Sequence, residues 1–262
     1  MGNSIHPIPA FADNYIWIFS DPGTNQACVV DPGDSSAVIK YLESHGLTLS
    51  TILVTHHHPD HTGGVKDLTN RFNSKVYGPK NSPFDGIGQE LEENNTVSVF
   101  GYQFRILQVP GHTLDHIAYY CESPPSGGRP LLFCGDTLFA AGCGRIFEGN
   151  PVMMFASLQK LAGLPAATEV YCTHEYTLAN LKFAATAEPD NPQLQERIAA
   201  ARITRQRDLP TLPSSIALEL ATNPFLRCAE TPLLTAASQH AGAELQDPVE
   251  VFATLRRWKD QF

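Results

Sequence analysis

The amino-acid sequence predicts a mixed α and β fold (α+β) that is followed by a region made of helices. Two observations lead to this prediction. Up to about residue 175, short apolar runs alternate with turn-forming residues, and helical patterns fall between them. Beyond that point the apolar residues keep helical spacing, as in Leu194, Ile198 and Ala201. We therefore expect two domains, residues 1–175 and residues 176–262.

The expected strands are short apolar runs that end at turns. The first two, residues 15–19 and 27–30, end at Asp21-Pro22-Gly23 and Asp31-Pro32-Gly33, residues that favour turns. A Pro- and Gly-rich stretch at 123–128 is expected to be a hairpin loop. The other expected strands are 51–54, 75–77, 97–100, 103–109, 117–121, 131–134 and 169–172, with helices near 35–46, 64–72 and 152–162.

Helix starts in the C-terminal region are indicated by a capping residue followed by Pro at the first helical position. This pattern occurs at Asn191-Pro192, Thr231-Pro232 and Asp247-Pro248. The last of these leads into Val251, Leu255 and Trp258, which again keep helical spacing. The sequence therefore predicts helices throughout this region.

Bulk composition limits the class of protein. With 262 residues, 42% hydrophobic and 17% charged, the chain is long and apolar enough to bury a sizeable core. The formal net charge of −9 disfavours nucleic acid as a partner, since phosphate binding needs basic surface. No apolar run has membrane-spanning length, and the N-terminus lacks a signal-peptide pattern. We expect a soluble protein with no membrane partner.

The six cysteines are scattered at irregular spacing, and no CxxC motif occurs. Several lie inside apolar runs, such as Cys28 and Cys134, where a free thiol behaves as a small hydrophobic side chain. We expect reduced cysteines and a cytoplasmic location. Nothing in the sequence suggests an exposed apolar stripe, so a monomer is expected.

A dense group of metal-binding residue types follows the expected strand 51–54. The stretch THHHPDHTGG contains the pattern HxHxDH, formed by His56, His58, Asp60 and His61. Residues two apart on an extended chain point the same way, so His56 and His58 can converge on one metal ion. After Pro59 the chain must turn, which lets Asp60 and His61 face a second point close by. A non-metal role would leave these imidazoles and carboxylates repelling or unsatisfied.

Three further candidate ligands stand where other apolar runs end. His112 follows the run 106–109, Asp136 follows 131–134, and His174 follows 170–172. Each would be a structural residue if taken alone, but the shared position at the end of a buried strand favours a ligand. His56, His58 and His112 would hold one metal, and Asp60, His61 and His174 the other. Asp136, with two carboxylate oxygens, would bridge them.

Imidazole and carboxylate donors suit zinc, with iron or manganese as alternatives, and the absence of cysteine ligands argues against a closed structural zinc site. Other histidines receive different interpretations. His57 is expected in support of the site or at the surface, and His116 either supports the site or is a packed histidine. His6, His45 and His240 are expected at the surface.

These motifs resemble the metallo-β-lactamase superfamily and, within it, the hydroxyacylglutathione hydrolase (glyoxalase II) family. The superfamily resemblance comes from residues 55–64 together with the segments around His112, Asp136 and His174. The closer resemblance comes from the following segments, which span nearly the whole chain: Phe11-Ala12-Asp13-Asn14-Tyr15, Gly135-Asp136-Thr137-Leu138-Phe139 with Gly142-Cys143-Gly144-Arg145, Thr173-His174-Glu175-Tyr176-Thr177 with Asn180-Leu181, and Arg256-Arg257-Trp258-Lys259-Asp260-Gln261-Phe262.

The resemblance implies a four-layer αββα sandwich that carries a binuclear metal site, followed by a small helical domain that helps to bind glutathione. It implies that Arg256 and Lys259 hold the glycine carboxylate of glutathione, and three residues apart they share a helix face. It also implies that Tyr176 binds substrate. Asn180, one turn later, would face the substrate or be merely a helix contact.

Two residues depart from the family pattern. Arg145 stands where lysine is common, and its guanidinium keeps the cation, so carboxylate or amide binding should survive. Phe147 stands where tyrosine is common and lacks the hydroxyl, whose hydrogen bond would be worth about 0.5–1.5 kcal/mol. Both positions are expected to contact substrate, and glutathione affinity is expected to be weaker.

The implied reaction is hydrolysis of S-D-lactoylglutathione to D-lactate and glutathione, the second step of methylglyoxal detoxification. A metal-bridging hydroxide would attack the thioester carbonyl, with Asp60 and Asp136 as the catalytic carboxylates. Alternatives are a persulfide dioxygenase with one iron, a β-lactamase or lactonase, an RNA-processing nuclease, and a metal-binding protein with a vestigial site. No GxSxG elbow, Walker A loop or GxGxxG motif occurs.

Overall fold

A computed structural model of the chain describes residues 5–125 and 127–262. Residues 1–4, part of the N-terminus in which no signal peptide was expected, lie outside these residues. Ser126 of the expected hairpin loop also lies outside them. The chain forms two units: Met1–Gln108 with Asp115–Gly135, and Val109–Leu114 with Asp136–Phe262. These units divide the chain elsewhere than at residue 175, so the domains expected at 1–175 and 176–262 stay a prediction.

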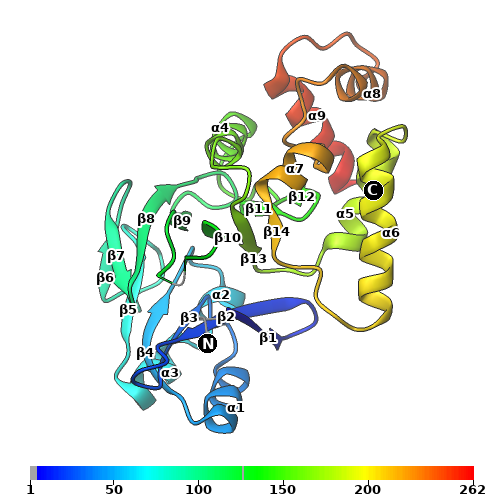
Figure 1. Ribbon diagram of the computed structural model, residues 1–262. Coiled ribbons are helices and arrows are strands. Elements are labelled where there is room, and N and C mark those ends of the chain that lie inside the picture. The colour runs from blue at the N-terminus through cyan, green and yellow to red at the C-terminus, as the bar shows by residue number, and fades with distance from the viewer. Residues whose placement is uncertain (1–4, 126) are drawn as a thin grey trace. The chain divides into compact units, whose positions relative to one another are not determined.

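The first unit contains a six-stranded sheet in which sequence neighbours are also spatial neighbours (Figure 1). The strands β1 to β3 pair antiparallel, and β3 to β6 pair parallel. β1 lies at the sheet edge, where Pro7 and Pro9 are tolerated because an edge strand need not donate every N–H. The strands are β1 (His6–Ala10), β2 (Asn14–Ser20), β3 (Gln26–Val30), β4 (Thr48–Leu53), β5 (Lys75–Pro79) and β6 (Gln89–Leu91).

Four further strands of the first unit form an antiparallel series, β7 (Thr96–Val99), β8 (Tyr102–Gln108), β9 (Ile117–Cys121) and β10 (Leu131–Gly135). Their aromatic side chains meet the first sheet at Phe19, whose ring centroid lies 5.0 Å from that of Tyr102 and 6.1 Å from that of Phe133. The Tyr119 hydroxyl donates to the carbonyl of Val54 at 2.9 Å. These contacts form the interior of a two-sheet sandwich.

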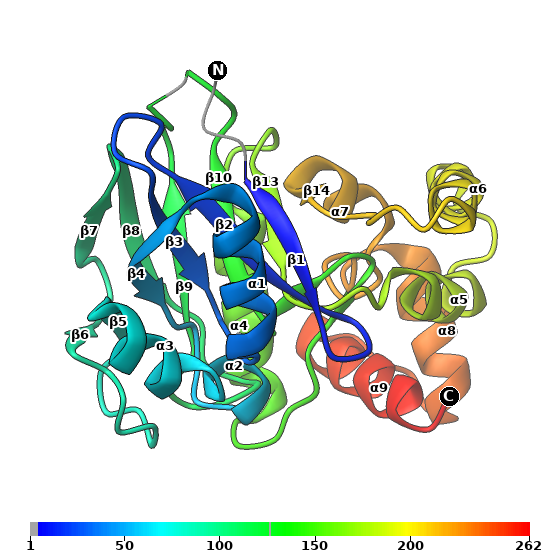
Figure 2. The ribbon, with the colours of Figure 1, turned by 90° about the horizontal axis from the view of Figure 1, so that it is seen from below.

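Helices α1 (Ser35–His45), α2 (Pro59–Thr62) and α3 (Val65–Phe72) complete the first unit. Val38, Leu42 and Leu68 from α1 and α3 pack against apolar side chains of β1 to β5 in one buried cluster. Figure 2 shows the ribbon of α1 beside the strands of this sheet. α1 begins where the Asp34 carboxylate accepts the backbone N–H of Ser36 and ends at Gly46, which is left-handed with φ 64°. The amphipathic helices therefore cover the outer face of the first sheet.

The second unit is mainly helical and supports two short hairpin strands, β11 (Leu138–Phe139) and β12 (Gly142–Cys143), and the pair β13 (Glu169–Cys172) and β14 (Ser214–Ser215). Its helices are α4 (Pro151–Ala162), α5 (Thr177–Ala187), α6 (Pro192–Gln206), α7 (Ile216–Thr222), α8 (Thr231–Ala241) and α9 (Pro248–Asp260). Buried rings of Phe183, Phe225 and Phe252 stack or meet edge-on in the centre of this unit.

Two of the three predicted helix caps are confirmed. Asn191 accepts the N–H of Leu194 and Asp247 accepts the N–H of Val249. The third prediction was displaced by one residue, because Thr231 is the first residue of α8 and Glu230 precedes it without a side-chain cap. The predicted α+β class with a helical C-terminal region is confirmed by the observed elements.

Across the described parts of the chain, every helix is too short or too polar to cross a lipid bilayer.

Candidate metal centre

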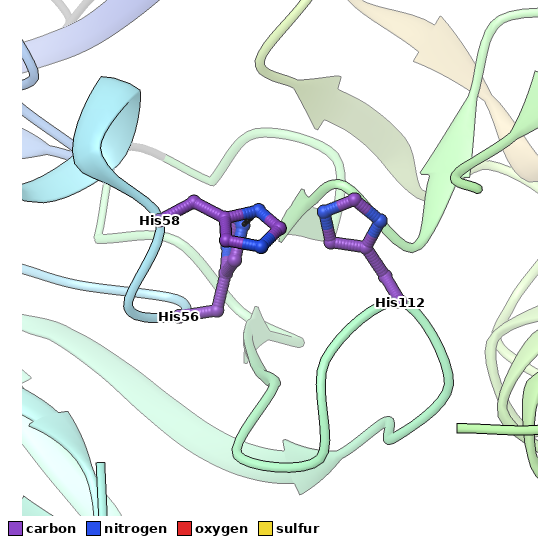
Figure 3. A group of neighbouring side chains, drawn as sticks. All are labelled: His56, His58 and His112. Atoms are coloured by element: carbon purple, nitrogen blue, oxygen red, sulfur yellow. Dashed lines mark hydrogen bonds between the residues drawn. The ribbon is translucent and has the colours of Figure 1, made fainter. Parts of the chain in front are cut away.

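The four donors of the HxHxDH motif lie together in the first unit. His56 and His58 follow β4, and their rings lie side by side (Figure 3), with Nε2 of His56 3.1 Å from Nδ1 of His58. His61 lies against them, because its ring centroid is 4.1 Å from that of His56. Its Nε2 is 3.4 Å from Oδ2 of Asp60. The four side chains therefore lie close together within this unit, and their assignment as metal ligands stays a prediction.

The turn that brings Asp60 and His61 back toward His56 is made by the short helix α2, which has Pro59 at its first position. The segment Asp31-Pro32-Gly33 packs against this helix so closely that a side chain would not fit. A Cβ on Gly33 would lie 1.9 Å from the carbonyl oxygen of Asp60. Glycine at position 33 is therefore required for the backbone approach that places the two donors.

Asp31 is a buried carboxylate beside the predicted donors that the sequence analysis did not include in the site. It is 2% exposed, and its carboxylate accepts hydrogen bonds from the backbone N–H and the hydroxyl of Thr55, both at 2.7 Å. Oδ2 of Asp31 also lies 3.0 Å from Nδ1 of His61. The negative charge so close to Nδ1 favours a proton on that nitrogen, which would leave the lone pair of Nε2 for a metal.

A signal for Asp31 was present in the sequence but was interpreted only as the end of a strand. Asp31 has φ 52°, a left-handed conformation that Asp adopts more readily than most residues. The same turn that ends β3 therefore aims a buried carboxylate at a histidine of α2. Asp31 follows a buried strand in the same way as Asp136, and that position was the reason for including Asp136 in the predicted site.

Two further histidines of the first unit, His57 and His116, lie beside the predicted donors. Nδ1 of His57 lies 2.9 Å from a carboxylate oxygen of Asp115. The ring of His116 stacks on that of His56 with centroids 4.6 Å apart, and its Nδ1 is 3.1 Å from the carbonyl of Ile117. His116 is thus a packed histidine beside a predicted ligand. This position agrees with either interpretation left open by the sequence, a supporting residue of the site or a packed histidine. His6, His45 and His240 are exposed, as predicted.

The other three donors converge in the second unit. Oδ2 of Asp136 lies 3.5 Å from Nε2 of His112 and 3.3 Å from Nε2 of His174. All three side chains are buried. Two imidazole nitrogens therefore face the same carboxylate oxygen, the arrangement expected of a carboxylate that serves two neighbouring metal positions.

The backbone of the following segment sets the protonation of His112. Its Nδ1 lies 2.7 Å from the carbonyl oxygen of Arg145, an atom that can only accept, so Nδ1 carries the proton and Nε2 keeps its lone pair. Figure 3 shows the His112 ring extending from its loop. Gly144 makes this approach possible, since a Cβ there would lie 2.0 Å from the carbonyl of Asp136 and 3.0 Å from Nδ1 of His112.

Three of the predicted substrate residues are exposed beside these donors. The Phe147 ring, 63% exposed, meets the His112 ring edge-on at 5.3 Å. Tyr176 stacks on His174 with centroids 4.6 Å apart and an interplanar angle of 3°. The Arg145 side chain is 65% exposed and its Nε lies 3.6 Å from Asp260.

Two other predicted substrate residues are buried and bound within the chain. The Asn180 amide donates to the carbonyl of Ala140 at 2.9 Å, so the structure favours the helix-contact alternative for Asn180 over a substrate-facing position. Arg256 is also buried, where it donates to the carbonyl of Cys143 at 2.9 Å and to Asp260 at 2.9 Å. The guanidinium therefore binds groups of the protein itself, whereas a residue that holds a ligand carboxylate would be expected to be exposed.

Lys259 lies one turn after Arg256 and is half-buried. Burial, and then the positive charge of Arg256, lower the pKa of Lys259 to about 8. The lost solvation and the nearby guanidinium destabilise the charged ammonium more than the carboxylate of Asp260 stabilises it. A carboxylate ligand beside it would restore the ordinary preference for the charged form.

All seven predicted donors belong to groups of histidine and aspartate side chains that could hold metal ions. The donor set is five imidazoles and two carboxylates. This chemistry fits zinc, iron or manganese and differs from the thiolate-rich sets of closed structural zinc sites.

Comparison with known proteins gives matches over both parts of the sequence. Residues 10–174 match the model of the metallo-beta-lactamase superfamily, and residues 175–262 match the model described as the hydroxyacylglutathione hydrolase C-terminus. The chain is 54% identical over 259 residues to a hydroxyacylglutathione hydrolase of Pseudomonas aeruginosa, covering 98% of this chain and 99% of the relative. It is 49% identical over 260 residues to the protein of that name from Nitrosomonas eutropha, covering 98% of each.

Solved structures show the same fold. The chain resembles the crystal structure of the B3 metallo-beta-lactamase BLEG-1 with a TM-score of 0.62 and 23% identity, covering 85% of this chain and 99% of that one. It resembles ETHE1 from Myxococcus xanthus with a TM-score of 0.57 and 25% identity, covering 88% of this chain and all of that one (100%).

Proposed function

Since the chain belongs to the hydroxyacylglutathione hydrolases of the metallo-β-lactamase superfamily, we infer that it hydrolyses the thioester bond of hydroxyacylglutathiones. The observation that carries this inference is the match over the whole chain. Residues 175–262, the part that many members of the superfamily lack, match the C-terminal model of this family. A relative that shared only the HxHxDH motif would support the fold but not this substrate class.

We propose S-D-lactoylglutathione as the substrate. Water adds across its thioester, the carbon–sulfur bond breaks, and the products are D-lactate and glutathione. The thiol of glutathione has a pKa near that of cysteine, about 8.5, so it can leave as a thiolate. The leaving group therefore does not need a proton from the chain, unlike the nitrogen of an amide or lactam.

We assign the seven donors to two divalent metal ions. His56, His58 and His112 would hold one ion, while Asp60, His61 and His174 would hold the other, with Asp136 as the shared ligand. The 3.1 Å separation of the His56 and His58 nitrogens supports their pairing. The closeness of Asp136 to both His112 and His174, at 3.5 and 3.3 Å, supports its bridging role.

Two divalent cations held by these residues would supply hydroxide at neutral pH and positive charge for the developing oxyanion. The contribution of the chain is to keep the donors deprotonated at the right atom. The Arg145 carbonyl would do this for His112 through its hydrogen bond, and Asp31 would do it for His61 through its nearby negative charge. We propose Asp60 and Asp136 as the catalytic carboxylates, because they are the two anionic side chains among the seven donors. Zinc is the expected metal, and iron or manganese would suit the same donors.

We place the glutathione moiety against the exposed residues around His112 and His174. Lys259 and Arg145 would bind its glycine carboxylate, and Tyr176 would bind the peptide. The Arg256 guanidinium, bound to Cys143 and Asp260, would act by holding this surface in shape. Phe147 can contribute apolar contact but no hydrogen bond, which is why we expect a weaker grip on glutathione than a tyrosine would give.

The cellular setting follows from weaker observations. All six cysteines are free and buried, which fits a reducing compartment, and we propose the cytoplasm. The absence of a nucleic-acid partner stays a prediction from the acidic composition, and the absence of a membrane partner stays one from the lack of long apolar runs. A monomeric state also stays a prediction.

The test is the loss of the thioester ultraviolet absorbance of S-D-lactoylglutathione with purified, metal-replete protein. The expected result is turnover that a chelator abolishes and added zinc restores. A chromogenic β-lactam and glutathione persulfide, the latter with an oxygen electrode, test the alternative reactions. Turnover of either of these without thioester hydrolysis would contradict the proposal.

A further inference from the structure

Buried side chains from three helices and a helix end bind the backbone of the short β11–β12 hairpin. Asn180 of α5 donates to the carbonyl of Ala140 at 2.9 Å. Arg256 of α9 donates to the carbonyl of Cys143 at 2.9 Å. Together with the contacts of Glu219 and Asn223, these bonds reach every residue from Phe139 to Cys143.

Asn223, at the end of α7, makes the central contacts. Its amide nitrogen donates to the carbonyls of Phe139 at 3.2 Å and Gly142 at 2.9 Å, and to Glu219 at 3.0 Å. Its carbonyl oxygen accepts the N–H of Phe225 at 3.0 Å. Asn223 is fully buried, and a buried amide is tolerated only when its hydrogen bonds are made. This asparagine therefore ties the two ends of the hairpin turn to the helical region.

The turn of the hairpin needs such support. Ala141 has φ 54°, a left-handed conformation that residues with a Cβ rarely adopt. Its N–H donates to the carboxylate of Glu219 at 2.8 Å, and Glu219 is fully buried and paired with Arg197. The turn is thus held in an unfavourable backbone conformation by a charged, buried acceptor.

The hairpin leads directly into the segment that controls His112. Gly144 follows β12, donates its N–H to the carbonyl of Thr137 at 3.2 Å, and lies against the Asp136 carbonyl and the His112 ring. The next residue, Arg145, supplies the carbonyl that accepts from Nδ1 of His112 at 2.7 Å. A shift of the hairpin would therefore move the atom that selects the tautomer of His112.

We propose that Asn223 is a positioning residue for the metal centre: by clamping the β11–β12 hairpin, it holds the Arg145 carbonyl on Nδ1 of His112 and keeps Nε2 available to a metal. This proposal rests on the proposed function only in taking His112 as a metal ligand. It gives the helical region a second role, because side chains remote from the donors determine how well a donor is oriented.

The test compares Asn223→Ala with Asn191→Ala. Asn191 is a matched control, since its buried amide also donates to a carboxylate, that of Glu188 at 3.0 Å, and to a carbonyl, that of Ala221 at 2.9 Å. Its oxygen also accepts an N–H, that of Leu194. Both variants should lower the melting temperature, but only Asn223 contacts the hairpin.

Two measurements on each variant follow. Long-range ¹H–¹⁵N spectra of metal-free protein report the tautomer of His112, assigned with the His112→Gln variant. Competition with a chromogenic chelator reports the zinc affinity. We expect Nδ1–H in the wild type and in Asn191→Ala, and a mixture of tautomers in Asn223→Ala. We expect zinc affinity to fall about 10- to 100-fold in Asn223→Ala and to change little in Asn191→Ala.

Equal losses of zinc affinity in the two variants, or an unchanged His112 tautomer in Asn223→Ala, would overturn the proposal. If Asn223→Ala does not fold, Asn180→Ala removes one bond to the same hairpin and should give the same changes to a smaller degree; no change there would likewise overturn it. Both readouts measure metal binding or spectra and do not measure turnover. A failure of the thioester assay would therefore contradict the proposed function without deciding the test of Asn223.

Discussion

Replacing Lys259 with alanine should weaken substrate binding far more than it slows the chemical step. Lys259 is half-buried in the last turn of α9, beside the buried Arg256, and both effects lower the pKa of Lys259 to about 8. A carboxylate ligand therefore stabilises the charged form of Lys259 more than it would stabilise the charged form of an exposed lysine. In the proposed glutathione site it would bind a carboxylate that is remote from the thioester bond, so its interaction should be the same in the ground state and in the transition state.

The magnitude follows from the type of bond that is lost. A hydrogen bond to a charged group is worth about 1.5–3 kcal/mol, which corresponds to a rise in KM of about 10- to 150-fold. The kcat should fall by less than about threefold, because uniform binding does not lower the barrier of the bound complex.

The pH dependence gives a second, independent signature. With a pKa of about 8, Lys259 is about 90% protonated at pH 7 and about 10% protonated at pH 9. If only the protonated form binds the carboxylate, KM of the wild type should rise about tenfold between these values. Lys259→Arg keeps its charge throughout this range, so its KM should stay nearly constant apart from changes in the substrate itself.

The assay is steady-state thioester hydrolysis at a series of pH values for the wild type, Lys259→Ala and Lys259→Arg. Comparing the wild type with Lys259→Arg removes the titration of the substrate amine, which both enzymes share. A collapse of kcat with little change in KM for Lys259→Ala would refute the placement of glutathione. Parallel pH profiles of KM for the wild type and Lys259→Arg would refute the role of the ammonium.

Three further substitutions test the support of the donors. Asp31→Asn should reduce zinc affinity about 10- to 100-fold in a chelator competition, because the neutral amide removes the negative charge beside Nδ1 of His61; unchanged affinity would exclude this role. Gly144→Ala should abolish most turnover while the chain still folds by circular dichroism, since its Cβ would lie 2.0 Å from the Asp136 carbonyl; near-normal kcat would contradict the close approach. Glu219→Gln should lower the free energy of unfolding by about 3–5 kcal/mol in urea, because it breaks a buried ion pair, and a loss below about 1 kcal/mol would show that the pair contributes little.

Much of the candidate site could be predicted from the sequence because its donors are tied to strands. His56 follows β4, His112 follows β8, Asp136 follows β10 and His174 follows β13. A strand has a fixed direction and ends at a known residue, so the residue after it has a predictable place. The same local logic predicted the caps at Asn191 and Asp247.

The misses come from contacts between residues distant in the sequence. Arg256 matches a family position, but the structure buries it against the β11–β12 hairpin, which periodicity alone does not reveal. For Asn180, the buried contact with Ala140 agrees with the helix-contact alternative that the sequence left open. Asp31 directly follows a buried strand, but Asp31-Pro32-Gly33 was interpreted only as a turn, and its closeness to His61 is visible only in the structure. The strand β1 was not predicted, because Pro7 and Pro9 argue against a strand unless it lies at a sheet edge.

The central claim is that this chain holds two metal ions through its seven histidine and aspartate donors. The most direct measurement is the metal content of the metal-free protein after titration with zinc, removal of excess by gel filtration, and elemental analysis. Two zinc ions per chain are predicted for the wild type. A wild-type protein that retains one ion or none at saturation would contradict the account.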